Sequence, residues 1–328
     1  MQTASNRTIL KIAIMAGALA SLALVFSSHA RLHRWRLQGS DSDDPQAQMA
    51  LARSLYNQRR LPEAQQAFER AAQLAPEDAR PCNWLTTLAL ESNRPDLALH
   101  SIDESLKRNP HDYTVWRTAG DLFLKQGDRH SALKSYRQAT TVNAKDAASW
   151  KCLGILEAEI DPAAGIRDLQ QAAALSPDDF DTQLAMGQAA LTAGNTLIAE
   201  RALRKALALR PTDSAALLAS ARLLMTSDLS AETLKRAGEQ IDAAIQSNPS
   251  PMAYQLRGRQ RLLDRRYPAA IADLNEAIRR DPTLPSAHAY LSQAFAATHR
   301  AGLARKEADT FARLTGRQRT VTAGSDHP

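Results

Sequence analysis

The chain has 328 residues, of which 44% are hydrophobic, 23% charged and 5% aromatic. Its 13 glycines are few for a protein built on glycine-rich phosphate loops, and its two distant cysteines exclude a disulfide framework and a zinc ribbon. Few aromatic residues and abundant alanine favour closely packed helices over a β-sandwich. The net charge is +6, but residues 1–36 hold five Lys or Arg residues and no acid. The excess charge therefore belongs to the N-terminus, which leaves little support for a nucleic-acid-binding face.

The N-terminal segment has the order of a signal sequence or a membrane anchor. Two basic residues precede an uncharged apolar run at residues 12–28, and three arginines follow it between residues 31 and 36. The run is at the short limit for a membrane-spanning helix, which needs roughly 17–25 residues. We expect residues 1–30 to be an uncleaved signal anchor. A signal peptide cleaved near Ala30 and a soluble chain with a buried helix are the alternatives.

Residues 31–44 are expected to be a basic juxtamembrane segment that leads into an acidic linker. Because positive charge stands on both sides of the apolar run, the charge pattern alone leaves the orientation open. We expect a single-pass membrane protein whose folded part lies outside the cytoplasm, in the periplasm of a bacterial envelope. A cytoplasmic folded part and an exported soluble protein are the alternatives.

The rest of the chain repeats one pattern eight times. A small residue occurs at Ala64 and recurs at spacings of 33 to 38 residues, usually with a bulky residue four positions later. A proline closes most repeats, at Pro76, Pro110, Pro177, Pro211, Pro249 and Pro282. With 15 prolines in 328 residues, chance would place fewer than one at these positions, so the prolines establish the period.

Each repeat has the pattern of two amphipathic helices joined by a short turn. Residues 116–120 and 150–154 place bulky, apolar and small residues one helical turn apart, and breakers such as Gly127 and Gly194 follow in the turns. With these motifs the chain resembles the tetratricopeptide repeat (TPR) family, whose pattern is W-x2-L-G-x2-Y, then A-x3-F, then P. The resemblance implies an all-α fold: a right-handed superhelical solenoid of about eight antiparallel helix pairs, preceded by a single apolar N-terminal helix.

The predicted repeats are 45–78, 79–112, 113–146, 147–179, 180–213, 214–250, 251–284 and 285–316. Ala144 stands where most repeats have the closing proline. The sixth repeat has about four extra residues near 226–233, which predict a longer turn. Gly316 falls one period after Pro282, where a helix C-cap is expected, and residues 317–328 are predicted to be a flexible tail.

The repeats contain no recognisable catalytic, metal-binding or cofactor-binding motif. Phosphate-loop, dinucleotide, nucleophile-elbow and zinc-helix motifs are all absent from the sequence. The histidines lack ligand spacing and are expected to be solvated surface residues: His100, His111, His130, His288 and His299. The cysteines are expected to be small buried residues. Because the helix pairs fill residues 45–316, we expect no enzyme, no cofactor, no metal and no small-molecule substrate.

In the TPR family the first helix of each repeat lines the inner groove, so the resemblance implies a partner-binding surface there. Carried over position by position, the groove residues are Arg53, Asn57, Asn83, Arg117, Asp121, Lys151, Ile155, Leu184, Gln188, Leu218, Arg222 and Arg259, together with Met49, Thr87 and Gln255. The Lys and Asn set with which some members hold a terminal carboxylate is absent, and one of its positions holds Trp84. Spaced cations around an apolar middle suit an amphipathic helix or extended segment with acidic side chains.

These patterns predict a non-enzymatic, membrane-tethered scaffold that binds a peptide or helix of a partner protein, for example in an envelope or secretion assembly. An accessory subunit that positions a separate catalytic partner is the alternative. No nucleic acid is expected as a partner.

Overall fold

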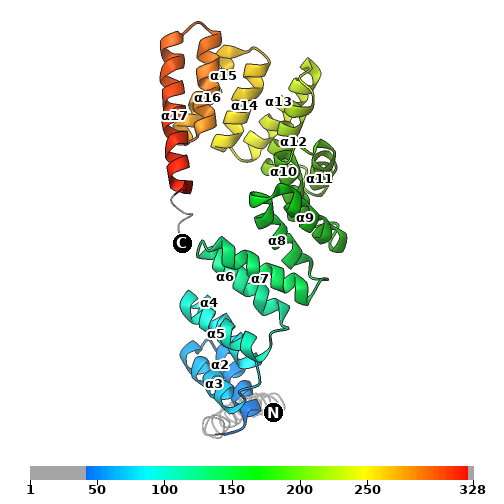
Figure 1. Cartoon of the computed structure of the whole chain (residues 1–328), viewed down its shortest axis with the longest axis vertical. Coiled ribbons are helices and arrows are strands. Elements are labelled where there is room, and N and C mark those ends of the chain that lie inside the picture. Colours follow the sequence, from blue (N-terminus) through cyan, green and yellow to red (C-terminus); the bar gives the residue numbers. More distant parts are fainter. Residues whose placement is uncertain (1–41, 324–328) are drawn as a thin grey trace, which may run out of the picture. The chain divides into compact units, whose positions relative to one another are not determined.

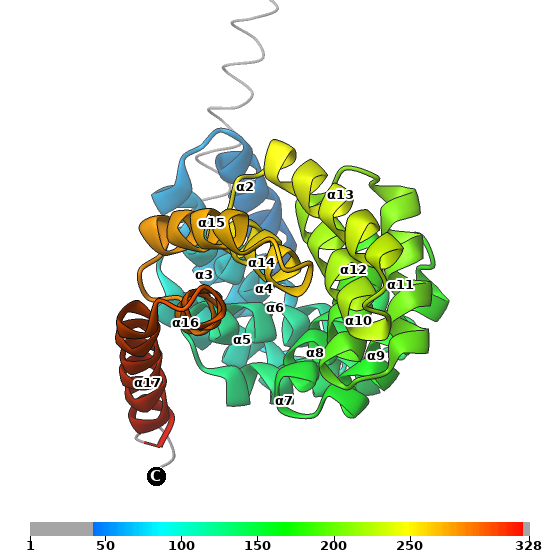
Figure 2. The same ribbon diagram turned by 90° about the horizontal axis from the view of Figure 1, so that it is seen from above.

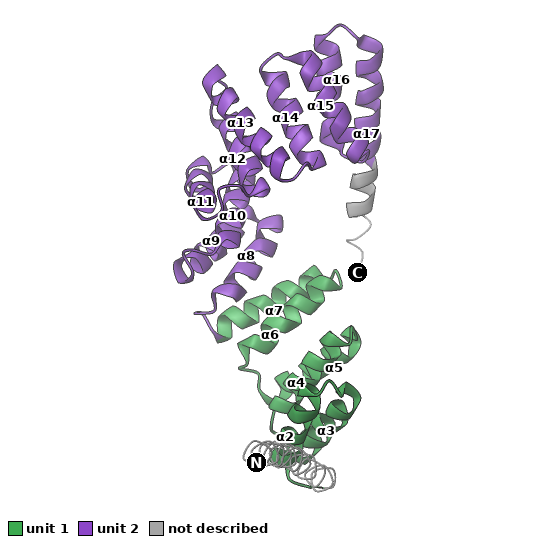
Figure 3. Ribbon diagram, turned by 180° about the vertical axis from the view of Figure 1, so that it is seen from behind, with its two compact units in different colours: residues 1–142 green, residues 143–328 purple. Residues whose placement is uncertain are grey.

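The computed structural model describes residues 42–323 (Figure 1), so the apolar run at 12–28 and the expected anchor lie outside the described residues. Within residues 42–323 the chain forms 16 α-helices and no strand, which confirms the all-α prediction. The described chain belongs to two compact units, residues 1–142 and residues 143–328, coloured green and purple in Figure 3.

Unit 1 contains three helix pairs. They are α2 (Pro45–Asn57) with α3 (Leu61–Leu74), α4 (Arg80–Glu91) with α5 (Pro95–Arg108), and α6 (Tyr113–Lys125) with α7 (Arg129–Val142). The two helices of a pair pack against each other, and α3 contacts α4 while α5 contacts α6. Each pair is therefore stabilised by its neighbour, as stacked repeats require.

Unit 2 contains five helix pairs. They are α8 (Ala147–Ile160) with α9 (Pro162–Leu175), α10 (Phe180–Thr192) with α11 (Thr196–Leu209), α12 (Ser214–Ser227) with α13 (Ala231–Ser247), α14 (Pro251–Leu263) with α15 (Tyr267–Arg280), and α16 (Pro285–Ala297) with α17 (Ala301–Ala323). Figure 2 looks onto the end of this unit, where α15 and α17 flank α16.

Aspartates fix the start of several first helices. Asp112, Asp146, Asp179 and Asp213 precede α6, α8, α10 and α12, and each accepts a hydrogen bond of 2.9–3.1 Å from a backbone N–H in the first turn. Such N-caps satisfy N–H groups that have no partner inside the helix. These aspartates follow the closing position of a repeat by two residues, so the sequence sets both the end of one repeat and the start of the next.

The fourth residue of several repeats bonds the backbone at the closing position of the preceding repeat. Trp116 and Trp150 donate from Nε1 to the carbonyls of Pro110 and Ala144, each over 2.9 Å. Gln183 donates in the same way to the carbonyl of Pro177, over 3.1 Å. The bond occupies a carbonyl that lies between helices, outside any helical hydrogen-bond ladder.

In four of the described pairs a glycine of the first helix faces a buried bulky residue of the second. A Cβ atom added at Gly120 would lie 2.6 Å from the ring of Tyr136, and one added at Gly187 would lie 2.6 Å from Leu203. Tyr136 and Leu203 are each 1% exposed. The small residues of the second helices are fully buried as well, at Ala64, Ala98, Ala132, Ala199, Ala237 and Ala270. The small and bulky positions that defined the repeat are therefore core positions.

Two local predictions were wrong. The extra residues of the sixth repeat were predicted to lengthen a turn, but they lengthen the helices: α13 has 17 residues, and only three residues separate it from α12. The Ser230 side chain accepts from the Thr233 N–H and starts α13 early. The tail was predicted to begin at residue 317, but α17 continues through Gly316 to Ala323. A helical glycine costs only about 1 kcal/mol, and no proline stands between Gly316 and Ala323 to end the helix.

A charged cluster that the repeat pattern does not predict joins three helices of unit 2. Asp273 of α15 bonds Arg257 (2.8 Å) and Arg261 (2.7 Å) of α14, and Arg257 also bonds Asp242 of α13 over 2.8 Å. The Asp273 side chain is only 6% exposed. Because the carboxylate is buried, it depends on the two guanidinium groups for its neutralisation.

We predict that Gly154→Leu destabilises unit 2 by about 3 kcal/mol or more through overpacking. A Cβ atom at this position would lie 2.8 Å from Leu169 Cγ and 2.9 Å from the carbonyl oxygen of Gly165. Urea denaturation followed by circular dichroism measures the change. Gly302→Ala is the control, because a Cβ there meets no atom within 4 Å; an unchanged midpoint for Gly154→Leu would contradict the packing.

We predict that Asp273→Ala costs about 3 kcal/mol, because it removes the buried carboxylate that Arg257 and Arg261 share and leaves the partly buried Arg261 without an ion pair. Glu276→Ala on the same helix is the matched control, since Glu276 also bonds two arginines, Arg279 and Arg280, but on the helix surface. The control should lose much less stability in the same urea titration. Equal losses for the two variants would show that the buried cluster has no special role.

Candidate functional site

The first helices of successive repeats lie side by side in unit 2. α8 contacts α10, α10 contacts α12, α12 contacts α14 and α14 contacts α16. Their outward side is therefore one continuous surface, called here the first-helix face.

An open cleft of about 810 Å³ lies on this face and is called the unit 2 cleft. It is lined by Gln188, Thr192, Ser214, Ala215, Leu218, Ala219, Arg222, Asn248, Ser250, Met252, Gln255, Leu256, Arg259, Ser286 and Tyr290. Four of the predicted groove residues, Gln188, Leu218, Arg222 and Arg259, are among them, and so is Gln255. The structure thus brings these residues of three successive first helices to one cleft.

The unit 2 cleft is cationic and partly apolar. Arg222 and Arg259 are the charged residues that line it, and neither has a carboxylate partner among the described residues. Arg259 lies over the ring of Tyr290, with 5.7 Å between the guanidinium carbon and the ring centroid. Met252 is 52% exposed and offers apolar surface beside these groups. An unneutralised guanidinium beside apolar side chains suits a carboxylate in an amphipathic segment.

A second cleft, the unit 1 cleft, lies between α2 and α4 and has a volume of about 600 Å³. It is lined by Gln46, Met49, Ala50, Arg53, Tyr56, Arg80, Asn83, Trp84 and Thr87. The predicted residues Arg53 and Asn83 lie here, with Met49 and Thr87. Arg80 is neutralised by Asp78 over 2.7 Å.

Aromatic side chains form one wall of the unit 1 cleft, and the repeat pattern did not predict them among the groove residues. The Trp84 ring stacks on Phe68, with 5.4 Å between centroids and planes 6° apart, and meets the Tyr56 ring edge-on at 5.2 Å. The Arg53 guanidinium carbon lies 5.9 Å from the Trp84 centroid. The signal available in the sequence was Trp84 itself, a large aromatic residue close to the expected groove positions.

Three predicted groove residues make polar contacts inside the fold. Asn83 donates to Asp112 over 3.2 Å, and Asp121 accepts from the Tyr136 hydroxyl over 2.6 Å. Lys151 forms a 3.1 Å ion pair with Asp179. These contacts hold helices together, so the side chains are not fully available to a ligand.

The Asp179 carboxyl is one of these structural groups. Burial raises its pKa, but the hydrogen bond from Thr182 and the Lys151 ammonium outweigh burial and hold the pKa below its usual value. The remaining predicted residues lie outside both clefts: Asn57, Arg117, Ile155 and Leu184. Ile155 is 39% exposed and Leu184 is half-buried against Phe180.

His288 was predicted to be a solvated surface residue, and this was wrong. The residue is 6% exposed, with Nδ1 2.6 Å from Glu307 Oε2 and Nε2 3.2 Å from the carbonyl oxygen of Pro282. Since a carbonyl only accepts, Nε2 carries the proton that bonds Pro282. His288 is the fourth residue of its repeat and takes the role of Trp116 and Trp150, so repeat position was the signal that could have revealed it.

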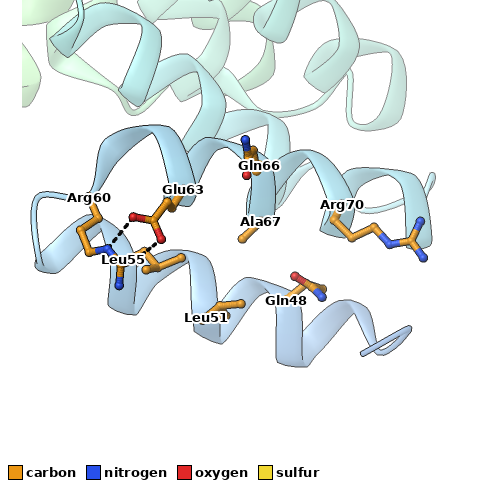
Figure 4. Close-up of a pocket in the computed structure, with 8 residues that line it drawn as sticks. All are labelled: Gln48, Leu51, Leu55, Arg60, Glu63, Gln66, Ala67 and Arg70. Carbon is orange, nitrogen blue, oxygen red and sulfur yellow. Dashed lines mark hydrogen bonds and ion pairs between the residues drawn. The ribbon is translucent and has the colours of Figure 1, made fainter. Parts of the chain in front are cut away.

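A smaller pocket of about 310 Å³ lies between α2 and α3 (Figure 4). Its charged residues bond carboxylates: Arg60 Nε donates to Glu63 over 2.6 Å, and Arg70 pairs with Asp43 over 2.6 Å. The pocket therefore offers a ligand fewer unneutralised charges than the two clefts on the first helices.

The described part of the chain contains no group of three or more His, Cys, Asp or Glu side chains placed to hold a metal. Among the described residues no helix is both long and apolar enough to cross a membrane. No disulfide joins Cys82 and Cys152, and burial raises the pKa of the Cys82 thiol.

Family models for the tetratricopeptide repeat match residues 45–78, and also 87–128, 117–180, 184–251 and 226–285. The chain belongs to the TPR family.

Individual TPR proteins resemble parts of the chain. Mouse tetratricopeptide repeat protein 33 is 30% identical over 97 residues, which cover 30% of this chain and 37% of that protein. The APC/C hetero-tetramer Cut9-Hcn1 matches with a TM-score of 0.59 at 16% identity, over 82% of this chain and 53% of that one. YrrB, described as a TPR protein with an unusual peptide-binding site, matches with a TM-score of 0.50 at 17% identity, over 56% and 96%. Because the identities are only 16% and 17%, these two matches show a shared fold and carry no information on function.

Proposed function

We propose that this protein is a non-enzymatic scaffold that holds a segment of a partner protein on the first helices of its repeats. The observation that carries the proposal is the unit 2 cleft, where Leu218, Arg222 and Arg259 meet on one open surface. The TPR fold and the peptide-binding site named for YrrB support the same use of that surface.

The charges of the cleft favour an acidic partner segment. Arg222 and Arg259 have no carboxylate among the described residues, and no acidic residue lines the cleft. Opposite charge on the partner would be attracted to such a surface and held in one register, while basic segments would be repelled. The exposed Met252 and the half-buried Leu218 would receive apolar side chains of the same segment.

We further propose that residues 1–30 tether the scaffold to a membrane and that the repeats act outside the cytoplasm, in an envelope or secretion assembly. The support is the order of basic, apolar and basic residues in the sequence. A reporter fused after residue 328 tests this: activity of an export-dependent reporter is expected, and activity confined to a cytoplasmic reporter would overturn the orientation.

We predict that a photo-crosslinking amino acid at position 218 captures a partner protein in the native host, because this position lines the unit 2 cleft. Position 197 is the control, since Leu197 is 66% exposed but lies on α11, a second helix. Mass spectrometry identifies the adducts. Equal adducts at both positions, or none at 218, would remove the binding role of this face.

We predict that Arg222→Glu weakens that capture about tenfold or more, because it replaces attraction by like-charge repulsion in the cleft. Arg201→Glu on the exposed side of α11 changes the net charge equally and should leave capture unchanged. Comparing adduct yields at position 218 in the two backgrounds separates a local effect from an effect of total charge. Equal yields would contradict the acidic-segment proposal.

A further inference from the structure

The two clefts contain the same pair of side chains at equivalent repeat positions. In unit 1, Arg53 is the ninth residue of its repeat and lies over Trp84, the sixth residue of the next repeat. In unit 2, Arg259 and Tyr290 hold the same two positions. The two partners are 31 residues apart in the sequence in both cases. The pair therefore occurs once in each unit, in both cases at a junction, that is, the contact between the first helices of two successive repeats.

The geometry of the two pairs is nearly the same. The guanidinium carbon lies 5.9 Å from the Trp84 centroid and 5.7 Å from the Tyr290 centroid. Both distances fall within the roughly 6 Å reach of a cation–π interaction. Each ring is supported from behind: Trp84 stacks on Phe68, and Tyr290 packs against the buried cluster around Leu274 and Leu291.

Both arginines lack a carboxylate partner in the described part of the chain. Arg210, which lies 4.2 Å from the Phe180 ring centroid, also has no carboxylate partner among the described residues, but it lines neither cleft. Two other arginines over a ring differ from the cleft arginines in this respect. Arg257 and Arg280 both lie over Tyr254, but Arg257 bonds Asp273 and Arg280 bonds Glu276. The stacked arginines of the clefts are thus held on a ring yet not neutralised.

The pair does not recur at the other described junctions. The ninth residue Arg222 is followed at the sixth position of the next repeat by Leu256, and Ile155 is followed there by Ala185. An arginine at the ninth position followed by an aromatic residue at the sixth position of the next repeat occurs only at the first and last junctions between the eight repeats, 45–316. The arrangement is therefore a feature of these two places and not of the repeat pattern as a whole.

We infer that each arginine–ring pair is a subsite, within its own unit, that binds one acidic side chain of a partner segment next to a bulky apolar residue of that segment. This inference rests on the proposed function. The ring fixes the plane of the guanidinium group and leaves the N–H donors at its edge, which match the two oxygens of a carboxylate. Because the group is held in place before binding, less side-chain freedom is lost on binding.

The neighbouring side chains specify the apolar part of the ligand. In the unit 2 cleft Met252, 52% exposed, lies with Arg259 and Tyr290. In the unit 1 cleft Met49 lines the same space as Arg53 and Trp84 but is only 8% exposed, so the apolar surface there belongs mainly to the Trp84 ring. A methionine adapts its shape to different apolar side chains. Each subsite would therefore accept Asp or Glu beside any of several bulky apolar residues.

The test uses the full-length chain and a displayed library of random 12-residue peptides, with affinities then measured by titration calorimetry. We expect selected peptides to contain Asp or Glu beside a bulky apolar residue. Replacing that acid by its amide should weaken binding about 10- to 100-fold, the range of a charged hydrogen bond. Arg53→Lys should weaken one set of peptides, and Arg259→Lys another, although the net charge is unchanged.

Matched variants distinguish the stacked geometry from charge and from folding. Tyr290→Phe keeps the ring and should bind as the wild type does, whereas Tyr290→Leu should lose affinity as Arg259→Lys does. Arg201→Lys on α11 should have no effect. Circular dichroism reports whether each variant folds. If a ring variant does not fold, Arg53→Lys and Arg259→Lys still test the inference.

Wild-type affinities for Arg53→Lys and Arg259→Lys, or selected peptides without acidic residues, would overturn the inference. Crosslinking from position 218 would then still support the proposed function. Absence of that crosslinking would instead remove the proposed function, and the inference with it.

Discussion

The fold depends on a close contact, seen in four of the described helix pairs, between a glycine of the first helix and a bulky buried residue of the second. Gly120 lies against Tyr136 in unit 1 and Gly154 against Leu169 in unit 2, so closely that one added carbon would overlap its neighbour. The contact occupies the side of the first helix that faces its own pair. The outward side is left without a helix to cover it, and both clefts open there. Packing and binding thus use different residues of the same helices.

This separation explains what the sequence could predict. Core positions such as Ala64 and Leu169 recur with the period, because every junction imposes the same geometry, so their burial followed from spacing alone. The outward position of Leu218 and Arg222 followed from the same register. Contacts that join two particular helices have no period. The Lys151–Asp179 pair and the Asp273 cluster depend on side chains meeting across helices, which spacing does not reveal.

Side chains of different chemistry that make the same hydrogen bond were also not predicted from the sequence. Trp116, Gln183 and His288 all donate to the carbonyl six residues earlier, yet a search for similar residues does not group them. His288 was therefore predicted to be a surface residue, and only its hydrogen bonds show that it has the role of Trp116. Trp84 and Tyr290 were missed for the converse reason, because their position is aromatic at two junctions only. Periodicity identifies positions that every repeat needs and overlooks those that a few repeats use.

The bond from the fourth residue to the preceding repeat has a consequence for how such a chain changes over generations. Indole, amide and imidazole groups each donate to the carbonyl at the closing position of the preceding repeat. The contact between neighbouring repeats therefore tolerates chemically unrelated substitutions. The donor and the acceptor of this hydrogen bond are only six residues apart in the sequence. A duplicated or deleted segment of one period would therefore join its new neighbours with its hydrogen bonds intact, and the array could grow or shrink while the surfaces at its two ends diverge.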